Sequence, residues 1–362
     1  MNKPKIRFKG FEGEWKDSML SDFSYSICSG RDTAHKGIYP LYGSTGIIGT
    51  TNKPSYNGAM LLVARVGANA GKLQIINEEC GVSDNTLIIK PNGNISVSWW
   101  YYYLVHCNLN HLVYGSGQPL ITGYMLKRIP ILLGSKKECD EIASYFTALD
   151  TQIAASTSRL SSLKQIKAAS LLNMFPQKGE TVPRVRFKGF QGEWKEIKLG
   201  EIFSVEIGEF VIKTKQKNNA PYPVYNGGVS NTGFYDCYNQ EGPKIIVSAR
   251  GANAGYVNYC TTDFWAGNSC YSIGAKNNDE LKFFFYFLKR FQEIYMKNQY
   301  SASIPSISKQ QILRTNLIYP SLPEQRAIAS YFTALDAQIT LHRERLEKLK
   351  QIKAACLEKM FA

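Results

Sequence analysis

The chain has 362 residues, 44% of them hydrophobic, which fits two globular domains that each bury a core. Its 43 Lys and Arg exceed its 29 Asp and Glu, leaving a formal net charge of +14 that both halves share. This balance favours a polyanionic partner, either nucleic acid or an anionic membrane surface. We expect a cytoplasmic protein without membrane contact, because no apolar run reaches membrane-spanning length and the N-terminus lacks a signal-peptide apolar region.

The cysteines and histidines argue against a metal site. Eight cysteines contain no C-x-x-C pair, which is typical of reduced, buried thiols. The four histidines lie far from any cysteine pair, so a zinc site is not expected. We expect this chain to bind no metal and no cofactor.

The segment from Arg7 to Lys16, RFKGFEGEWK, recurs from Arg186 to Lys195 with nine of ten residues kept. We predict a turn that inserts Phe8, Phe11 and Trp15 as an apolar plug, a structural staple at the entrance of each domain. A ligand contact is the less favoured interpretation.

Short strands and turns follow from Leu20 to Leu133. Strands are predicted within 39–49, 59–67 and 85–91, and an apolar and aromatic run from Val97 to Leu112 predicts a helix. The second half repeats this order, with strand signals at 222–236, 244–255 and 264–274 and a helix at 280–296. Each domain is therefore predicted to be mixed and mostly strand.

Each half ends in nearly the same long helix. Residues 143–176 and 329–362 agree at 22 of 34 positions, and Ser135 to Glu138 and Ser321 to Glu324 are predicted capping boxes. Apolar residues three and four apart predict a narrow coiled-coil seam. The residues predicted for this helix pair, or for a partner interface, are Phe146, Leu149, Leu160, Leu163, Phe332, Leu335, Leu346 and Leu349.

Two interpretations are open for the motif GANAG, which follows an apolar strand at 67–71 and again at 251–255. One is a tight turn that glycine permits; the other is a turn whose Arg and Asn side chains reach a nucleic-acid backbone. A phosphate-binding loop is disfavoured, since three residues rather than four separate the glycines. Small polar loops before the long helices and after the first strands are further candidates. The predicted DNA-binding residues are Ser44, Thr45, Arg65, Asn69, Lys72, Ser116, Gln118, Tyr225, Asn226, Arg250, Asn253, Ser301 and Ser303.

No catalytic residues are predicted, because the chain carries no G-x-S-x-G, no H-E-x-x-H and no adenine-methyltransferase motif. Two alternatives stay open: a stand-alone DNA-binding regulator, and a self-contained DNA methyltransferase. The second would need a strand followed by G-x-G-x-x-G, which the sequence lacks.

The chain resembles the specificity subunits of type I restriction-modification enzymes along essentially its whole length. The resemblance rests on R-F-x-G-F-x-x-x-W at Arg7 and Arg186, GANAG, P-x-I-S at 305–308, and the segment LPEQRAIA at 322–329. The first copy departs from it at 138–140, where Glu-Cys-Asp replaces Glu-Gln-Arg, and at 118–122.

The resemblance implies an α+β fold: two strand-rich target recognition domains separated by two long antiparallel coiled-coil helices in a pseudo-two-fold repeat. We assign recognition domains to 1–137 and 186–320, spacer helices to 138–176 and 321–362, and a linker to 177–185. Each domain would read one half of an asymmetric, bipartite double-stranded DNA site. Two modification subunits would methylate adenine N6 with S-adenosylmethionine, and restriction subunits would use ATP and Mg²⁺. A helix of 34 residues, roughly 50 Å long, would leave unread base pairs between the half-sites.

Overall fold

The structure, a computed structural model, describes residues 3–92, 95–114, 119–276, 280–297 and 305–361. The chain divides into two compact units. Unit 1 comprises residues 1–158 and 343–362, and unit 2 comprises residues 159–342. Unit 1 therefore consists of two separate stretches of the sequence, and unit 2 of one continuous stretch. Both long helices are divided between the two units.

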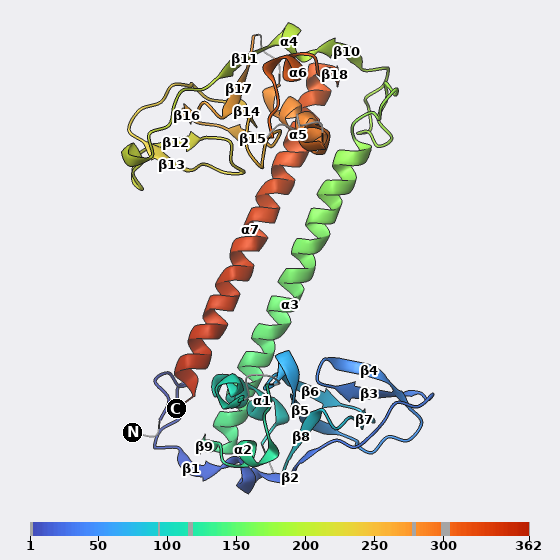
Figure 1. The fold of residues 1–362 in the computed structure, drawn as a ribbon, viewed down its shortest axis with the longest axis vertical. Coiled ribbons are helices and arrows are strands. Elements are labelled where there is room, and N and C mark those ends of the chain that lie inside the picture. The colour runs from blue at the N-terminus through green and yellow to red at the C-terminus, as the bar shows by residue number, and fades with distance from the viewer. Residues whose placement is uncertain (1–2, 93–94, 115–118, 277–279, 298–304, 362) are drawn as a thin grey trace. The chain divides into compact units, whose positions relative to one another are not determined.

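The two units contain matching sets of elements (Figure 1). Unit 1 has β1 (Lys16–Met19), η1 (Leu20–Phe23), β2 (Ser24–Ser29), β3 (Tyr39–Gly43), β4 (Gly46–Thr51), β5 (Ala59–Ala64), η2 (Gly67–Asn69), β6 (Leu73–Asn77), β7 (Gly81–Val82), β8 (Thr86–Pro91), α1 (Val97–His106), η3 (Leu109–Leu112), α2 (Gly123–Lys127) and β9 (Pro130–Leu133). Unit 2 has β10 (Lys195–Lys198), α4 (Leu199–Ile202), β11 (Phe203–Ile207), η4 (Lys213–Lys215), β12 (Tyr222–Tyr225), β13 (Gly233–Tyr235), β14 (Lys244–Ser248), β15 (Val257–Cys260), β16 (Trp265–Ala266), β17 (Cys270–Ala275), α5 (Leu281–Lys297), α6 (Lys309–Leu313) and β18 (Asn316–Tyr319). The long helices are α3 (Lys136–Asn173) and α7 (Leu322–Met360).

The sheets of the two units have the same topology. Unit 1 has an antiparallel sheet in the order β2-β8-β5-β6, a sheet β4-β3-β7 and the pair β1-β9. Unit 2 repeats this as β11-β17-β14-β15, β13-β12-β16 and β10-β18. In both three-stranded sheets one strand pairing is parallel, β3 with β7 and β12 with β16. The predicted α+β fold class and its internal repeat are therefore confirmed.

The central strand β5 is buried on both faces, which explains its unbroken apolar sequence. Alternate side chains of a strand point to opposite sides. Leu61 and Val63 accordingly join the core formed with α1, while Met60 and Leu62 join a second cluster with Tyr42 and Val82. In unit 2, β14 divides its side chains in the same way between two clusters.

The aromatic helices cover the four-stranded sheets. In α1, Trp99, Trp100 and Tyr103 are almost fully buried. This helix ends at His106, so the predicted continuation to Leu112 is wrong: Asn108 adopts the left-handed conformation (φ 47°) and a short 3-10 helix follows. The second helix, α5, forms close to its predicted bounds.

Each long helix is fastened at its start by a buried ion pair. Arg7 donates to both carboxylate oxygens of Glu138, at 2.7 and 2.8 Å, and Trp15 Nε1 donates to Glu138 at 3.0 Å. Arg186 binds Glu324 at the same two distances. The predicted apolar plug is confirmed for Trp15, which is buried, and for Phe8, which packs against the same core, but Phe11 is not part of that core. Ser135 caps Glu138 N at 3.3 Å as predicted. The second bond of each predicted capping box is wrong, because the Glu138 and Glu324 side chains bind arginines instead.

Within each unit the segments of α3 and α7 run antiparallel and are joined by the same polar triad. In unit 1, Lys353 pairs with Asp150 at 2.5 Å, and Tyr102 of α1 donates to Asp150 at 2.8 Å. In unit 2, Lys167 pairs with Asp336 at 2.5 Å, and Tyr286 donates to Asp336 at 2.9 Å. These bonds fix the axial register of the helix pair, a function that an apolar seam alone performs poorly.

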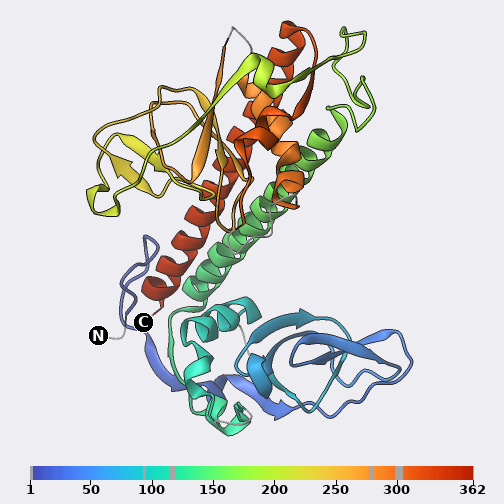
Figure 2. The same cartoon turned by 45° about the horizontal axis from the view of Figure 1, so that its top comes forward.

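The end of α7 packs in unit 1 in the same way as the end of α3 packs in unit 2. Ile6 N donates to Lys359 O at 2.9 Å, and Figures 1 and 2 both place the start of the chain beside the end of α7. Val185 N donates to Asn173 O at 2.9 Å in the same way. Phe361 stacks on Phe146, and Phe175 stacks on Phe332. Met360 and Phe361 are thus core residues of unit 1.

Three expectations concern cysteines, metals and membranes. All eight cysteines are free, but Cys28 and Cys237 are exposed, which corrects the prediction that the thiols are buried. Among the described residues, His, Cys, Asp and Glu side chains form no group that could hold a metal ion. None of the described helices has the length and apolar character that crossing a membrane requires.

Candidate nucleic-acid interface

The GANAG segments form the same tight turn in both units. Gly67 and Gly71 have φ values of 77° and 86°, and Gly251 and Gly255 have 88° and 87°. Only glycine adopts this conformation without strain. The turn closes when Gly71 N donates to Ala64 O at 2.8 Å, and Gly255 N donates to Ser248 O at 2.7 Å. The glycines of the motif are therefore explained by the turn.

A second segment hydrogen-bonds to each turn. Gly67 N donates to Pro119 O and Ile121 N donates to Arg65 O, both at 2.9 Å. Unit 2 repeats these bonds between Gly251 and Pro305 and between Ile307 and Ala249, again at 2.9 Å. In the first copy, Pro119 to Ile121 therefore makes the bonds that Pro305 to Ile307 makes in the second. The first copy does so although its sequence only approximates the P-x-I-S motif.

The two predicted arginines are not equivalent. Arg65 precedes its glycine by two residues and Arg250 by one, so their side chains point to opposite sides of an extended segment. Arg65 is half-buried and donates to Asp84 O at 3.3 Å. Arg250 is exposed. Of the two, Arg250 is the better placed for a DNA phosphate.

Three predicted residues of unit 1 come together. Ser44 and Thr45, in the turn between β3 and β4, line one cavity with Lys72, which follows the GANAG turn. This cavity, which we call the unit 1 cavity, has a volume of about 190 Å³ and is also lined by Gly43, Gly46, Leu62, Ala64, Leu73, Gln74 and Thr86. Asn69 lines a neighbouring cavity of about 400 Å³ between the turn and α1, to which Lys72 also contributes.

The predicted residues of unit 2 are more firmly built into the fold. Tyr225 packs in a hydrophobic cluster with Phe264, and burial raises the pKa of its hydroxyl to about 12. Asn226 Oδ1 accepts from Ser269 N at 3.1 Å, which shapes its loop. Asn253 is half-buried in the turn, where its carbonyl accepts from Tyr256 N at 2.9 Å. Ser116, Gln118, Ser301 and Ser303 lie outside the described residues.

Sequence reasoning missed one cation beside the second turn. Lys289 of α5 lies 3.9 Å from the ring centre of Tyr256 and donates to Val257 O at 2.8 Å and to Gln292 Oε1 at 2.7 Å. Burial, together with repulsion by Lys167, lowers the pKa of Lys289 to about 8. Directly after the turn, unit 1 has Lys72 and unit 2 has Tyr256. The positively charged side chain beside the turn is therefore Lys72 itself in unit 1 and Lys289 of α5 in unit 2.

Most of the residues predicted for the helix pair are buried. Phe146 and Phe332 are fully buried, and 2–8% of the surface of Leu149, Leu160, Leu163, Leu335 and Leu346 is exposed. Leu349 is partly buried and packs against the core of unit 1. These positions face protein within this chain, as a helix-pair seam requires.

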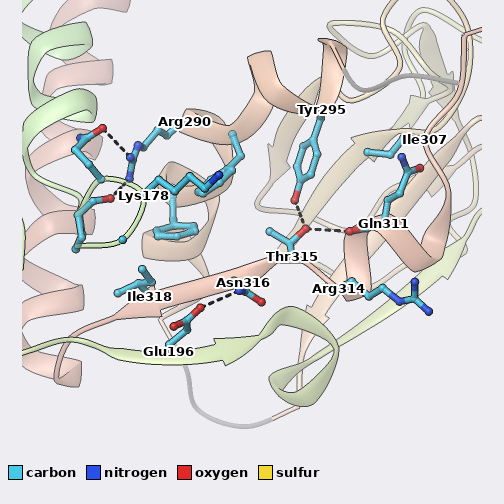
Figure 3. A pocket seen from close by; sticks show the side chains of 15 residues that line it. Lys178, Glu196, Arg290, Tyr295, Ile307, Gln311, Arg314, Thr315, Asn316 and Ile318 are labelled. Carbon is cyan, nitrogen blue, oxygen red and sulfur yellow. Dashed lines mark hydrogen bonds between the residues drawn. The ribbon is translucent and has the colours of Figure 1, made fainter. Parts of the chain in front are cut away.

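A larger cavity, of about 670 Å³, lies in unit 2 beside the linker and contains none of the predicted DNA-binding residues (Figure 3). On one side Arg290 donates to Pro176 O and to Gln177, at 3.1 Å in the second case. On the other side Tyr295 and Thr315 share a hydrogen bond of 2.6 Å. Arg290 thus anchors the chain just after α3, which gives the side chain a structural role here.

The fold and the doubled turn define a class of protein in which one scaffold presents two different polar surfaces. Residues 12–165 and 191–351 match the family described as the type I restriction modification DNA specificity domain. Because these matches cover most of the sequence, the chain belongs to this family, and the predicted role as a DNA specificity subunit rather than an enzyme is confirmed.

Individual relatives are distant in sequence. A protein named as a type I specificity subunit of Mycoplasma genitalium is 23% identical over 303 residues, which cover 82% of this chain and 79% of the relative. One from Mycoplasma pneumoniae is 22% identical over 304 residues, covering 82% and 81%. The crystal structure of a type I S subunit from M. genitalium shares the fold, with a TM-score of 0.76, 20% identity and 99% of both chains covered.

Proposed function

We propose that this chain binds an asymmetric, bipartite double-stranded DNA site, with one half-site read by each unit, and that partner subunits act on that DNA. Two modification subunits would transfer methyl groups from S-adenosylmethionine to adenine N6. Restriction subunits would use ATP and Mg²⁺ to cut. The chain itself would supply only the choice of site.

The observation that carries this proposal is a shared scaffold with unlike surfaces. Both units have the same turn, the same bonds to the P-x-I segment and the same triad. The side chains around the turn differ, with Lys72 in unit 1 and Tyr256 with Lys289 in unit 2. Two copies that position DNA alike but present different donors and acceptors would read different sequences.

Contacts to DNA are proposed at the turns and their neighbouring loops. In unit 1 these are Ser44, Thr45, Asn69 and Lys72, with Arg65 and the loop residues Ser116 and Gln118. In unit 2 they are Asn253 and the exposed Arg250, with Tyr225, Asn226, Ser301 and Ser303. Basic side chains would bind phosphates, and hydroxyl and amide groups would contact phosphates or base edges.

The buried seam residues of α3 and α7 are proposed to support partner binding indirectly. Their side chains hold the helix pair together, and the outer surface of that pair would receive the modification subunits. Disrupting the seam would then remove both the helix pair and the partner.

Reconstitution tests the proposal. The purified chain should bind DNA but not methylate it, and adding a co-purified modification subunit with S-adenosylmethionine should give adenine methylation at one split motif. Methyl transfer by the chain alone would favour the self-contained methyltransferase. Sequence-specific DNA binding with no co-purifying subunit would favour a stand-alone regulator.

A further inference from the structure

One cavity of unit 1 is lined by several polar side chains that have no partner within the protein. It lies between the GANAG turn and α1, has a volume of about 400 Å³, and is called the turn-helix cavity below. Lys72, Asn108 and Asn110 line it and are exposed, and Asn69 lines it and is half-buried. Among the described residues, none forms a hydrogen bond or an ion pair with these four side chains, and none of those lining the cavity is acidic. Four groups that can donate hydrogen bonds are therefore available to a ligand.

The left-handed residue after α1 brings two of these side chains to the turn. Asn108 has a φ of 47°, a conformation that asparagine adopts more readily than most residues. The backbone after it runs against the GANAG segment: a Cβ atom added at Gly71 would lie 3.1 Å from Asn110 Oδ1 and 3.3 Å from Leu109 C. Gly71 therefore allows the segment after α1 to approach the turn closely, and the two segments form the cavity together.

Unit 2 uses the corresponding positions for hydrogen bonds within the protein. Its helix α5 does not end at this point, and Gln292 takes the position of Asn108. The Oε1 atom of Gln292 accepts bonds from Lys289 at 2.7 Å and from Val257 N at 3.1 Å. Lys289 also lies over the ring of Tyr256. The ammonium and the amide of unit 2 are thus bound internally, whereas those of unit 1 are available.

We propose that the turn-helix cavity binds one phosphate group of the DNA backbone, a contact of unit 1 that unit 2 does not repeat. This inference rests on the proposed DNA-reading function. Lys72 and the three asparagines supply N–H donors, and the oxygens of a phosphate are acceptors. Because no carboxylate lines the cavity among the described residues, the charge of Lys72 favours an anion there.

A base edge explains the site less well than a phosphate does. Phosphates protrude along the outside of a duplex and can enter a concave site. Base edges lie recessed in the grooves, where side chains that protrude from a protein reach them. An ammonium group also binds a phosphate anion more strongly than it binds a neutral base. The contact would therefore fix the position of the duplex on unit 1 without reading its sequence.

The test compares variants of the full chain in complex with its modification subunit. The duplex contains the recognised site and carries a single methylphosphonate, a neutral analogue of a phosphate, at each position in turn. Lys72→Met removes the cation, Asn110→Ala removes one amide, and Asn110→Asp replaces that amide with a carboxylate of similar size. Lys16→Met is the matched control for the lost charge, because Lys16 is exposed in unit 1 but does not line the cavity. All three positions are exposed, so thermal unfolding should be unchanged.

We expect one methylphosphonate in one half-site to weaken binding by the wild-type complex about tenfold. In Lys72→Met the same methylphosphonate should cost about twofold or less, because the cation that contacts this phosphate is gone. Lys72→Met should also reduce the slope of affinity against salt by about 1. Asn110→Asp should bind more weakly than Asn110→Ala, since a carboxylate repels a phosphate. Lys16→Met and Lys289→Met should keep the wild-type response to this methylphosphonate.

Three results would overturn the inference. The first is a Lys72→Met complex that keeps the full response to every methylphosphonate. The second is equal affinity of Asn110→Asp and Asn110→Ala. The third is a loss of affinity in Lys72→Met that is confined to particular base sequences, which would indicate a base contact. A wild-type complex without preference for any duplex sequence would instead contradict the proposed function.

Discussion

The two units share the ion pairs and hydrogen bonds that hold their long helices in place, and they differ in the side chains at their surfaces. Arg7 with Glu138 and Arg186 with Glu324 have the same bond lengths, and the Asp-Lys-Tyr triads repeat within about 0.1 Å. Around the GANAG turns, by contrast, unit 1 presents Lys72, whereas unit 2 presents Tyr256 with Lys289 beside it. Two domains that read different DNA sequences need this combination, in which the scaffold is kept and the side chains at its surface differ.

The largest expected effect comes from placing a charge in the helix seam. Leu335→Asp should abolish folding of the helix pair, because a carboxylate would replace a side chain that is 7% exposed. Leu349→Asp, at a partly buried position, should cost less. Circular dichroism and co-purification with the modification subunit measure both. Equal, small effects of the two variants would show that the seam does not hold the pair.

The two buried ion pairs give a sharper comparison. Glu324→Ala should lower the free energy of unfolding by about 2–4 kcal/mol, because Arg186 loses its charged partner. Glu138→Ala should cost about 1 kcal/mol more, since it also removes the acceptor of the bond from Trp15. Denaturant unfolding of the full chain measures each difference. A larger cost for Glu324→Ala would contradict the bond pattern in the structure.

Lys289 predicts a pH dependence that involves unit 2. Its pKa of about 8 in the folded chain lies below the roughly 10.4 of an unfolded lysine, so between these values the unfolded chain binds more protons. The free energy of unfolding should therefore rise with pH in this window, by up to about 2 kcal/mol. Lys289→Met should flatten the profile, and Lys282→Met controls for the lost charge. A parallel profile for wild type and Lys289→Met would refute the effect.

The smallest effect concerns the arginines beside the turns. Arg250→Ala should weaken binding to all DNA sequences and reduce the slope of affinity against salt by about 1, because it removes one phosphate contact. Arg65→Ala should have less effect, since Arg65 is directed to Asp84 O. Fluorescence anisotropy at several salt concentrations measures this. Unaltered affinity would remove Arg250 from the interface.

The repeat, the strands and the long helices could be predicted because they depend on local periodicity and on self-similarity within the sequence. Contacts between residues far apart in the chain could not be predicted. Glu138 resembled a capping residue, whereas its partner Arg7 lies 131 positions away in the sequence. The end of α1 also escaped prediction, because its apolar pattern continues past Asn108 while the backbone reverses there. At the candidate site, the sequence indicated the turns but not Lys289, whose role depends on its burial beside Tyr256.

Mapping adenine methylation across the genome, in cells with and without this protein, tests the central claim most directly. We predict methylation at one split motif whose two halves differ, present only when the chain is present. A palindromic or continuous motif, or methylation that persists without the chain, would contradict the account.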